Sequence, residues 1–249
     1  MPTFIPADFA RDYLACAQIP AQFRTDILAS RSAAIAGKLL ENNEKFNLTA
    51  ITDPAEVLYK HILDSLLGAE MLASLLEGRI SPRMIDVGSG AGFPSLPMAA
   101  ALPELSVTAL DATQKKCDHM NETAAAVGLR NFRAVSGRAE DYGQNEGFRH
   151  SFDAVTARAV ANLPVLAELC LPLLKNGGYF LALKGSTAPA EWEQSASGIA
   201  KLGGEFRDMI PYTVPGDPNP RYFLIIQKKS LTPPKYPRHF SQIKKNPLH

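Results

Sequence analysis

The sequence predicts an α/β fold, in which a mostly parallel sheet with an antiparallel edge is preceded by an N-terminal helical cap. Three observations support this: apolar residues recur every three to four positions over residues 6–78, short apolar runs alternate with helical segments over residues 84–183, and two β-like runs follow at 204–211 and 221–227. The 249 residues, 46% of them hydrophobic, suit one domain with a small appendage and exclude low-complexity disorder.

The predicted cap covers residues 1–80. The apolar stripe of its main helix consists of Phe23, Ile27, Leu28, Ala34, Ile35 and Leu39. We expect Asn42 and Asn43 to close this helix. A further helix is expected to begin at Asp53, which is a favourable capping residue, because Pro54 suits the first helical position.

The predicted core covers residues 81–229. Its five parallel strands are expected at residues 84–87, 107–110, 132–135, 154–156 and 179–183. Short apolar runs separated by helices are typical of parallel strands that are buried on both faces. The two later runs flank a turn rich in Pro and Gly, and such a hairpin can add an antiparallel edge of two strands, giving seven in all.

Charge is distributed unevenly along the chain. Residues 218–249 hold seven basic residues and no acidic one, whereas the rest holds nineteen basic against twenty-five acidic residues, for a net charge of +1. We treat residues 230–249 as a basic C-terminal tail. Such a tail favours a polyanionic partner, because phosphate contacts release counterions, and a solvated tail that only aids solubility is the alternative.

Other classes of protein are disfavoured. The three cysteines, Cys16, Cys117 and Cys170, are too far apart in the sequence for a disulfide framework or a CxxC metal site, and we expect no bound metal. The longest apolar stretch is too short to span a bilayer, and the first residues lack a secretory signal. We therefore expect a cytoplasmic protein with no membrane association.

A glycine-rich turn follows the first predicted strand, where Gly88, Gly90 and Gly92 form a GxGxG pattern after Asp86. Open α/β sheets bind ligands at this edge, but a dinucleotide fingerprint would need its third glycine at Phe93. Asp86 could instead serve the ammonium of S-adenosylmethionine, and Asp111, which closes the second strand, could hold its ribose hydroxyls. The pattern favours a methyltransferase.

Further candidates lie in the loops that follow other strands. Ala139 and Glu140 after the third strand could read the adenine, although acidic residues also suit the first turn of any helix. Arg158 after the fourth strand could anchor the cofactor or a phosphate, with a structural salt bridge as the alternative. Lys115 and Lys116 begin a helix, where acids are usual, so they indicate a nearby polyanion or a solvated pair.

The absence of two motifs indicates which kind of substrate atom accepts the methyl group. It has no Asn/Asp-Pro-Pro-aromatic run for an exocyclic amine, and Cys170 sits in an apolar helical context rather than in a Pro-Cys motif. A guanine N7 fits, because this atom has a free lone pair and no proton to lose, so positioning could supply most of the acceleration. We name no catalytic acid or base.

Several motifs together resemble one family. They are Asn47-Leu48-Thr49-Ala50, the run from His61 to Ser65, the run from Asp86 to Pro94, the run from Ser136 to Glu140, the run from Ala157 to Ala161 and the run from Ala182 to Gly185. Over residues 40–228 the chain resembles the bacterial small-subunit ribosomal RNA guanine-N7 methyltransferases, the RsmG or glucose-inhibited division protein B family.

The resemblance implies a class I methyltransferase fold that uses S-adenosylmethionine to methylate a guanine N7 of 16S ribosomal RNA in the small subunit. The cofactor-binding residues that we expect are Asp86, Gly88, Gly90, Phe93, Asp111, Ala139, Glu140 and Arg158. The residues that we expect on the RNA side are Asn47, His61, Lys115, Lys116, Arg138 and Lys184. We expect the protein to act as a monomer.

Three other functions remain open from the sequence. A methyltransferase that acts on another RNA or on a small molecule would keep the cofactor site and make the basic tail incidental. A non-catalytic RNA-binding module on a degenerate scaffold is opposed by the intact Asp86, Gly88, Gly90 and Asp111. An NAD-dependent dehydrogenase is more distant, because the third glycine of its fingerprint is missing.

Overall fold

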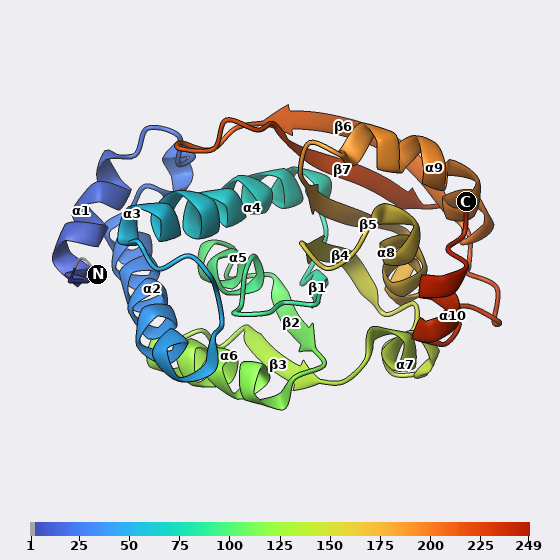
Figure 1. Ribbon diagram of the computed structural model, residues 1–249, viewed down its shortest axis with the longest axis horizontal. Helices are drawn as coiled ribbons and strands as arrows, with labels where there is room; N and C mark the ends of the chain where they lie inside the picture. Colours follow the sequence, from blue (N-terminus) through green and yellow to red (C-terminus); the bar gives the residue numbers. More distant parts are fainter. Residues whose placement is uncertain (1–2) are drawn as a thin grey trace.

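The computed structural model describes residues 3–249 and confirms the predicted α/β fold (Figure 1). Seven strands form one sheet in the order β3-β2-β1-β4-β5-β7-β6, in which the first five run parallel and the last two are antiparallel. The strands are β1 (Arg83–Val87), β2 (Ser106–Asp111), β3 (Phe132–Ser136), β4 (Phe152–Arg158), β5 (Leu174–Lys184), β6 (Gly204–Tyr212) and β7 (Arg221–Lys228).

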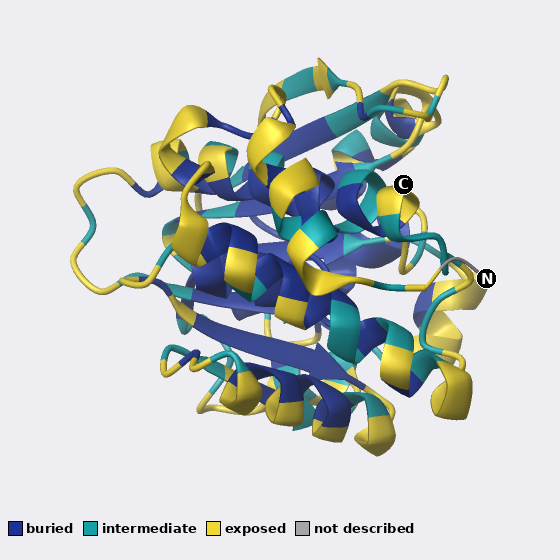
Figure 2. Ribbon diagram, turned by 90° about the vertical axis from the view of Figure 1, so that its left-hand side faces the viewer, coloured by how far each residue is buried: buried dark blue, intermediate teal, exposed yellow. Residues whose placement is uncertain are grey.

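Helices cover both faces of the sheet (Figures 1 and 2). On one face lie α4 (Asp64–Leu75), α5 (Ser95–Ala101) and α6 (Gln114–Ala126), and on the other lie α7 (Ala139–Gln144), α8 (Leu163–Cys170) and α9 (Ala188–Lys201). Figure 2 shows these helices buried toward the sheet and exposed on their outer sides. No helix within residues 3–249 is long and apolar enough to cross a membrane.

The central strands are buried on both faces because helices pack on each side. Met84 and Ile85 of β1 are neighbours in the chain, are both 0% exposed, and belong to two different apolar clusters. Successive side chains of a strand point to opposite faces, so one short run contributes to two cores. This explains why the strands read as continuous apolar runs rather than as alternating patterns.

The part of the predicted cap that the structure describes, residues 3–80, contains α1 (Pro6–Ala15), α2 (Asp26–Phe46), α3 (Pro54–Val57) and α4, which packs on the sheet. The prediction that Asn42 and Asn43 end the main helix was wrong, because Asn42 is buried and bonds to His119 Nδ1 of α6 at 2.9 Å, and α2 continues to Phe46. Ile27 and Ala34 were also misplaced in the apolar stripe, since both are exposed. The buried face of α2 is shifted and includes Ala29, Ser32, Ala33 and Ala36.

The second cap helix begins as predicted and runs without a break into α4. Asp53 Oδ1 accepts hydrogen bonds from the backbone N–H groups of Ala55 and Glu56, each at 3.0 Å. Between α3 and α4 the residues Leu58–Leu63 form a π-helical turn. Such turns are frequent at functional sites, and His61 of this one contacts Arg158, which ends β4 at the carboxyl edge of the parallel strands.

The C-terminal tail is packed against α7 and α8, which cover the second face of the sheet, rather than extended into solvent (Figure 1). Ile243 of the short helix α10 (Phe240–Lys245) is 0% exposed, and Arg149 donates hydrogen bonds to the carbonyls of Thr232, Pro233 and Tyr236. Arg238 forms a two-pronged ion pair with the fully buried Glu168 of α8, at 2.8 and 2.6 Å. The tail is therefore part of the folded body.

We expect the substitution Arg238→Ala to destabilise the protein by about 3 kcal/mol, because it leaves the Glu168 carboxylate buried without its partner. Urea unfolding measures the difference. The added substitution Glu168→Gln should recover part of the loss, and Lys235→Ala, at an exposed position, should change stability by less than about 0.5 kcal/mol. An Arg238→Ala protein as stable as the wild type would contradict this account.

Candidate active site

The carboxyl edge of the parallel strands carries two neighbouring cavities. The first, which we call the glycine-loop cavity, has a volume of about 330 Å³. Its lining residues are Leu48, Thr49, His61, Gly88, Ser89, Gly90, Ala91, Phe93, Asp111, Lys116, Arg158, Ala159 and Val160. Five of the eight residues predicted to bind a cofactor, and two predicted to bind RNA, are brought together here.

The backbone of the glycine loop shapes this cavity. Gly88 has a φ of +73° and Gly90 a φ of +59°, a region that L side chains rarely adopt. A Cβ atom at Gly88 would also lie 2.5 Å from Cγ2 of Val160, which follows β4. Glycine is therefore needed at position 88 both for its conformation and for the close approach of the neighbouring loop.

Two acidic residues flank the loop in different ways. Asp111, at the end of β2, lines the cavity, and its two oxygens accept hydrogen bonds from the N–H groups of Gly90 and Thr113 at 3.0 and 2.9 Å. Asp86 is 0% exposed and does not line the cavity. Its Oδ1 accepts a hydrogen bond from Thr156 at 2.8 Å, whereas its Oδ2 has no partner, and burial raises the pKa of this carboxyl.

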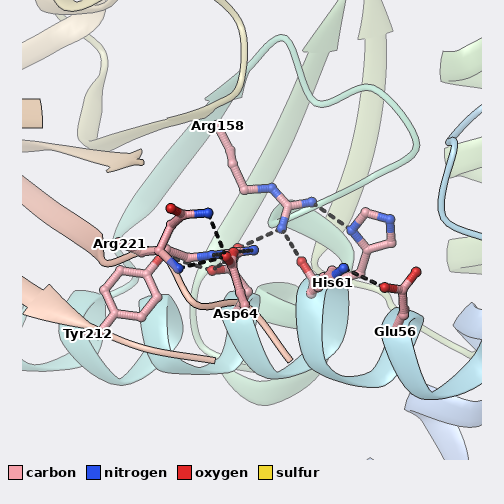
Figure 3. A network of polar contacts seen from close by, with 9 residues as sticks. Glu56, His61, Asp64, Arg158, Tyr212 and Arg221 are labelled. Carbon is pink, nitrogen blue, oxygen red and sulfur yellow. Dashed lines mark hydrogen bonds and ion pairs between the residues drawn. The ribbon is translucent and has the colours of Figure 1, made fainter. Parts of the chain in front are cut away.

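A buried ion-pair network links the cap to the sheet beside this cavity (Figure 3). Asp64 of α4 is 0% exposed, and its Oδ2 accepts from Arg158 at 2.6 Å. Its Oδ1 accepts from Arg221 at 2.7 Å and from the Tyr212 hydroxyl at 2.8 Å. Arg158 thus forms the salt bridge that the sequence left as an alternative, and a role toward the cofactor stays a prediction.

His61 is held in one neutral tautomer. Because a guanidinium only donates, Nδ1 of His61 accepts from Arg158 at 3.2 Å, and its Nε2–H donates to Thr49 Oγ1 at 3.1 Å. The imidazole stacks on Phe93 with ring centroids 4.7 Å apart. Burial, and then the positive charge of Arg158, lowers the pKa of His61 to about 3.

The second cavity, which we call the hairpin cavity, has a volume of about 540 Å³ and lies beside the β6–β7 hairpin. It shares His61, Arg158 and Ala159 with the glycine-loop cavity. Lys184, predicted on the RNA side, lines it at the end of β5 and pairs with Glu191 at 2.7 Å. Arg158 and His61 therefore form the boundary between two cavities.

The remaining predicted residues lie elsewhere. Lys115 is exposed over the ring of Phe46, and Asn47 ends α2 near another hollow beside the cap. Arg138 is exposed before α7, Ala139 packs on the second apolar cluster, and Glu140 lines a hollow that includes tail residues. The glycine-loop cavity is lined by none of these five residues.

Sequence reasoning missed the partners that fix the site. Asp64 appeared in the prediction only as part of the motif that begins at His61, without a role of its own. Tyr212 and Arg221 were not predicted to belong to the site. A weak signal existed for Asp64, because a position three residues after His61 lies on the same helix face. No local signal marks Tyr212 or Arg221, which lie 148 and 157 residues from Asp64 in the sequence.

Among the solved structures with the same fold are a fibrillarin and a methyltransferase. The chain matches an Aeropyrum pernix fibrillarin with natively bound S-adenosyl-L-methionine at 16% identity and a TM-score of 0.50, over 64% of this chain and 73% of that one. It matches a 16S rRNA (adenine(1408)-N(1))-methyltransferase from Catenulisporales acidiphilia at 14% identity and a TM-score of 0.50, over 65% and 92%. Both likenesses concern the fold.

The sheet order, the glycine loop and the acidic residue that ends β2 define a class I S-adenosylmethionine-dependent methyltransferase. Residues 32–212 match the family model for rRNA small subunit methyltransferase G, GidB. The chain belongs to this family. It is 47% identical to the Ribosomal RNA small subunit methyltransferase G of Staphylococcus saprophyticus over 84% of this chain and 86% of that protein, and 42% identical to that of Desulfitobacterium hafniense over 86% of each.

The residues at the glycine-loop cavity fit the family's cofactor. Gly88 and Gly90, whose positive φ angles favour glycine, put no side chain into the cavity, and Asp111 presents an acidic side chain that suits ribose hydroxyls. The unpartnered Oδ2 of Asp86 is a buried acceptor close in sequence to the loop, which suits a cationic group reached directly or through water. Methyl transfer is the chemistry that S-adenosylmethionine supplies when it is bound.

We expect Gly88→Ala to weaken S-adenosylmethionine binding at least tenfold, because the added Cβ must displace Val160 at the cavity wall. Gly128→Ala is a matched control, since Gly128 has nearly the same φ, +72°, and nothing within 4 Å of its Cβ position. Both variants should lose about 1 kcal/mol of stability from backbone strain. Calorimetric titration with equal affinities for the two would contradict the role of Gly88.

His61 should make stability depend on pH. Its pKa is near 6.5 when unfolded and about 3 when folded, so between these values the unfolded chain binds the extra proton, and stability falls as pH falls through this window. We expect His61 to lower the free energy of unfolding by about 2 kcal/mol at pH 5 and to leave it unchanged above pH 7. Urea unfolding at pH 7 and pH 5 should show a smaller pH effect for His61→Gln than for the wild type, and equal effects would be inconsistent with this origin.

Proposed function

We propose that this protein transfers a methyl group from S-adenosylmethionine to the N7 of a guanine in 16S ribosomal RNA of the small subunit. The observation that carries this proposal is the family match over residues 32–212, together with a glycine-loop cavity built as the cofactor requires. The names of the relatives specify an RNA of the small ribosomal subunit. The guanine and its N7 atom come from the resemblance of the motifs.

The side chains around the cavities suit an acceptor that has no proton to remove. His61 is neutral, and both of its ring nitrogens are engaged, by Arg158 and by Thr49. Asp64 accepts from three donors and is not free to act as a base. A guanine N7 carries a lone pair without a proton, so positioning of the acceptor is the main task left to the protein.

We place the cofactor in the glycine-loop cavity, with Gly88, Gly90, Phe93 and Asp111 in contact with it and Asp86 reaching it through water. Arg158 acts from the boundary by fixing His61 and Phe93, whose ring lies 5.8 Å from the guanidinium carbon. Ala139 and Glu140 do not line this cavity, so their proposed contact with the adenine requires the bound cofactor to extend beyond the cavity toward α7.

The RNA side is a wider surface than the cavities. His61, Lys116 and Lys184 lie at them, whereas Asn47, Lys115 and Arg138 extend the surface along α2, α6 and the start of α7. The three lysines and Arg138, spread in this way, suit backbone phosphates rather than one base. A cytoplasmic monomer that meets the small ribosomal subunit is the setting that we propose.

The test is transfer of radiolabelled methyl from S-adenosylmethionine to 16S RNA, either naked or within the small subunit, followed by aniline cleavage at 7-methylguanine. We expect one cleavage site, and a rate at low substrate concentration that falls at least tenfold between 50 and 200 mM salt, because phosphate contacts release counterions.

Each outcome separates the candidate functions. Transfer to RNA without aniline cleavage would keep the RNA substrate and reject N7. Absence of transfer to either substrate by a protein that binds the cofactor would reject ribosomal RNA and point to a different acceptor. Absence of cofactor binding would favour a non-catalytic RNA-binding module.

A further inference from the structure

Residues 232–238 of the C-terminal tail, which we call the strap, lie against the end of α7. Nε2 of Gln144 donates hydrogen bonds to the carbonyls of Pro234 and Pro237, at 3.2 and 2.9 Å. Gly143, the preceding residue, is buried, and a Cβ atom there would lie 2.7 Å from Cγ of Pro237. Glycine at position 143 therefore lets the strap approach the helix more closely than a side chain would permit.

One arginine fastens the strap to the helix. The guanidinium of Arg149 donates to the carbonyls of Gly143 and Tyr236, each at 2.7 Å, and to that of Thr232 at 2.8 Å. The carbonyl of Gly143 lies in the last turn of α7, where carbonyls lack a partner within the helix. α7 has only 6 residues, and so short a helix is marginal in water without tertiary contacts. The strap and Arg149 supply such contacts.

α7 is joined in turn to the loop that follows β3. The hydroxyl of Tyr142 donates to the carbonyl of Ser136 at 3.2 Å, and a Cβ atom at Gly137 would overlap the ring of Tyr142. The N–H of Gly137 donates to the carbonyl of Asp111 at 3.0 Å, and Asp111 lines the glycine-loop cavity. A continuous set of contacts therefore runs from the strap, through α7, to the wall of the glycine-loop cavity.

The first turn of α7 carries the two residues for which we expect contact with the adenine, Ala139 and Glu140. Their positions follow the position of the whole helix, because a single short helix moves as one unit. Groups that bind a ligand must be held within about 0.5 Å of their productive positions. A shift at the strap end of α7 should therefore be felt at the cofactor.

We propose that the strap positions α7, and with it Ala139 and Glu140, for the adenine end of S-adenosylmethionine. Gly143 and Gln144 are then positioning residues, which act on the cofactor through the helix and do not touch it. This inference rests on the proposed function, because it takes the cofactor to lie in the glycine-loop cavity with its adenine toward α7. It gives the strap a role in cofactor binding rather than in contact with a polyanion.

Gly143→Ala tests the strap, because the added Cβ must displace Pro237 or shift α7. The φ of Gly143 is not in the left-handed region, and alanine is the better helix former, so the substitution should not weaken the helix itself. Gly147→Ala is the matched control, since its Cβ would meet Oδ1 of Asn145 at 3.2 Å, and this exposed side chain can move aside.

A second variant, Gln144→Glu, keeps the shape of the side chain but replaces the donor that faces Pro234 and Pro237 with an acceptor. Gln144 is exposed, so this change leaves the apolar clusters intact. Gln194→Glu, at an exposed position of α9, is the control for the added charge.

We expect Gly143→Ala and Gln144→Glu to weaken S-adenosylmethionine binding at least ~5-fold by calorimetry, with kcat for methylation of the small subunit unchanged at saturating cofactor. 5′-Methylthioadenosine, which carries the adenosine without the amino acid, should lose affinity by the same factor. Gly147→Ala and Gln194→Glu should stay within about twofold of the wild type. A protein that is only destabilised would instead show fewer binding sites per chain, with the affinity of the folded fraction unchanged.

Unchanged cofactor affinity in both variants, each folded by circular dichroism, would overturn the role of the strap, and Gln144→Glu decides alone if Gly143→Ala does not fold. Weaker binding of S-adenosylmethionine with unchanged binding of 5′-methylthioadenosine would overturn the assignment to the adenine end. The two affinities are measured without RNA. An unmodified enzyme that binds the cofactor but methylates no RNA would therefore reject the proposed function and leave this test intact.

Discussion

The buried carboxylate of Asp64 is the constraint on which the arrangement of the site depends. A carboxylate with no exposed surface costs several kcal/mol unless donors surround it, and here the donors come from three other elements. Arg158 ends β4, Tyr212 ends β6 and Arg221 begins β7, while Asp64 itself begins α4. The Asp64 carboxylate is therefore satisfied only when α4, β4 and the β6–β7 hairpin meet at this point.

This meeting point divides the carboxyl edge of the sheet. β1 and β4 are neighbours, and in open α/β sheets a ligand crevice forms where the chain leaves adjacent strands in opposite directions. The glycine loop lies on one side of Arg158, and the hairpin cavity lies on the other. Because Asp64 and His61 hold the Arg158 guanidinium, the helices that precede β1 help to set the boundary between the two cavities, although they lie outside the sheet.

The fold could be predicted from the sequence because its signals are local. The buried strands appear as short apolar runs, the glycine loop follows β1 directly, and Asp53 with Pro54 marks a helix start. The end of α2 could not be predicted, because Asn42 is a typical stop signal in isolation, and only its long-range bond to His119 stabilises it inside a helix. Periodicity alone also misjudged Ile27, which keeps the spacing of the buried face but points into solvent.

The site was predicted less completely, since Asp64 pairs with Arg158, Tyr212 and Arg221 across 94 to 157 residues of sequence. Charge composition shows the difficulty most clearly. Seven basic residues follow position 217, but Arg221 and Arg238 neutralise buried carboxylates, and Lys228 is itself 0% exposed and donates to the carbonyl of Leu202. A count of charges assigns all seven to a polyanion, whereas the fold leaves fewer of them for that purpose. The electrostatic attraction for RNA must accordingly come also from basic residues on the body of the protein.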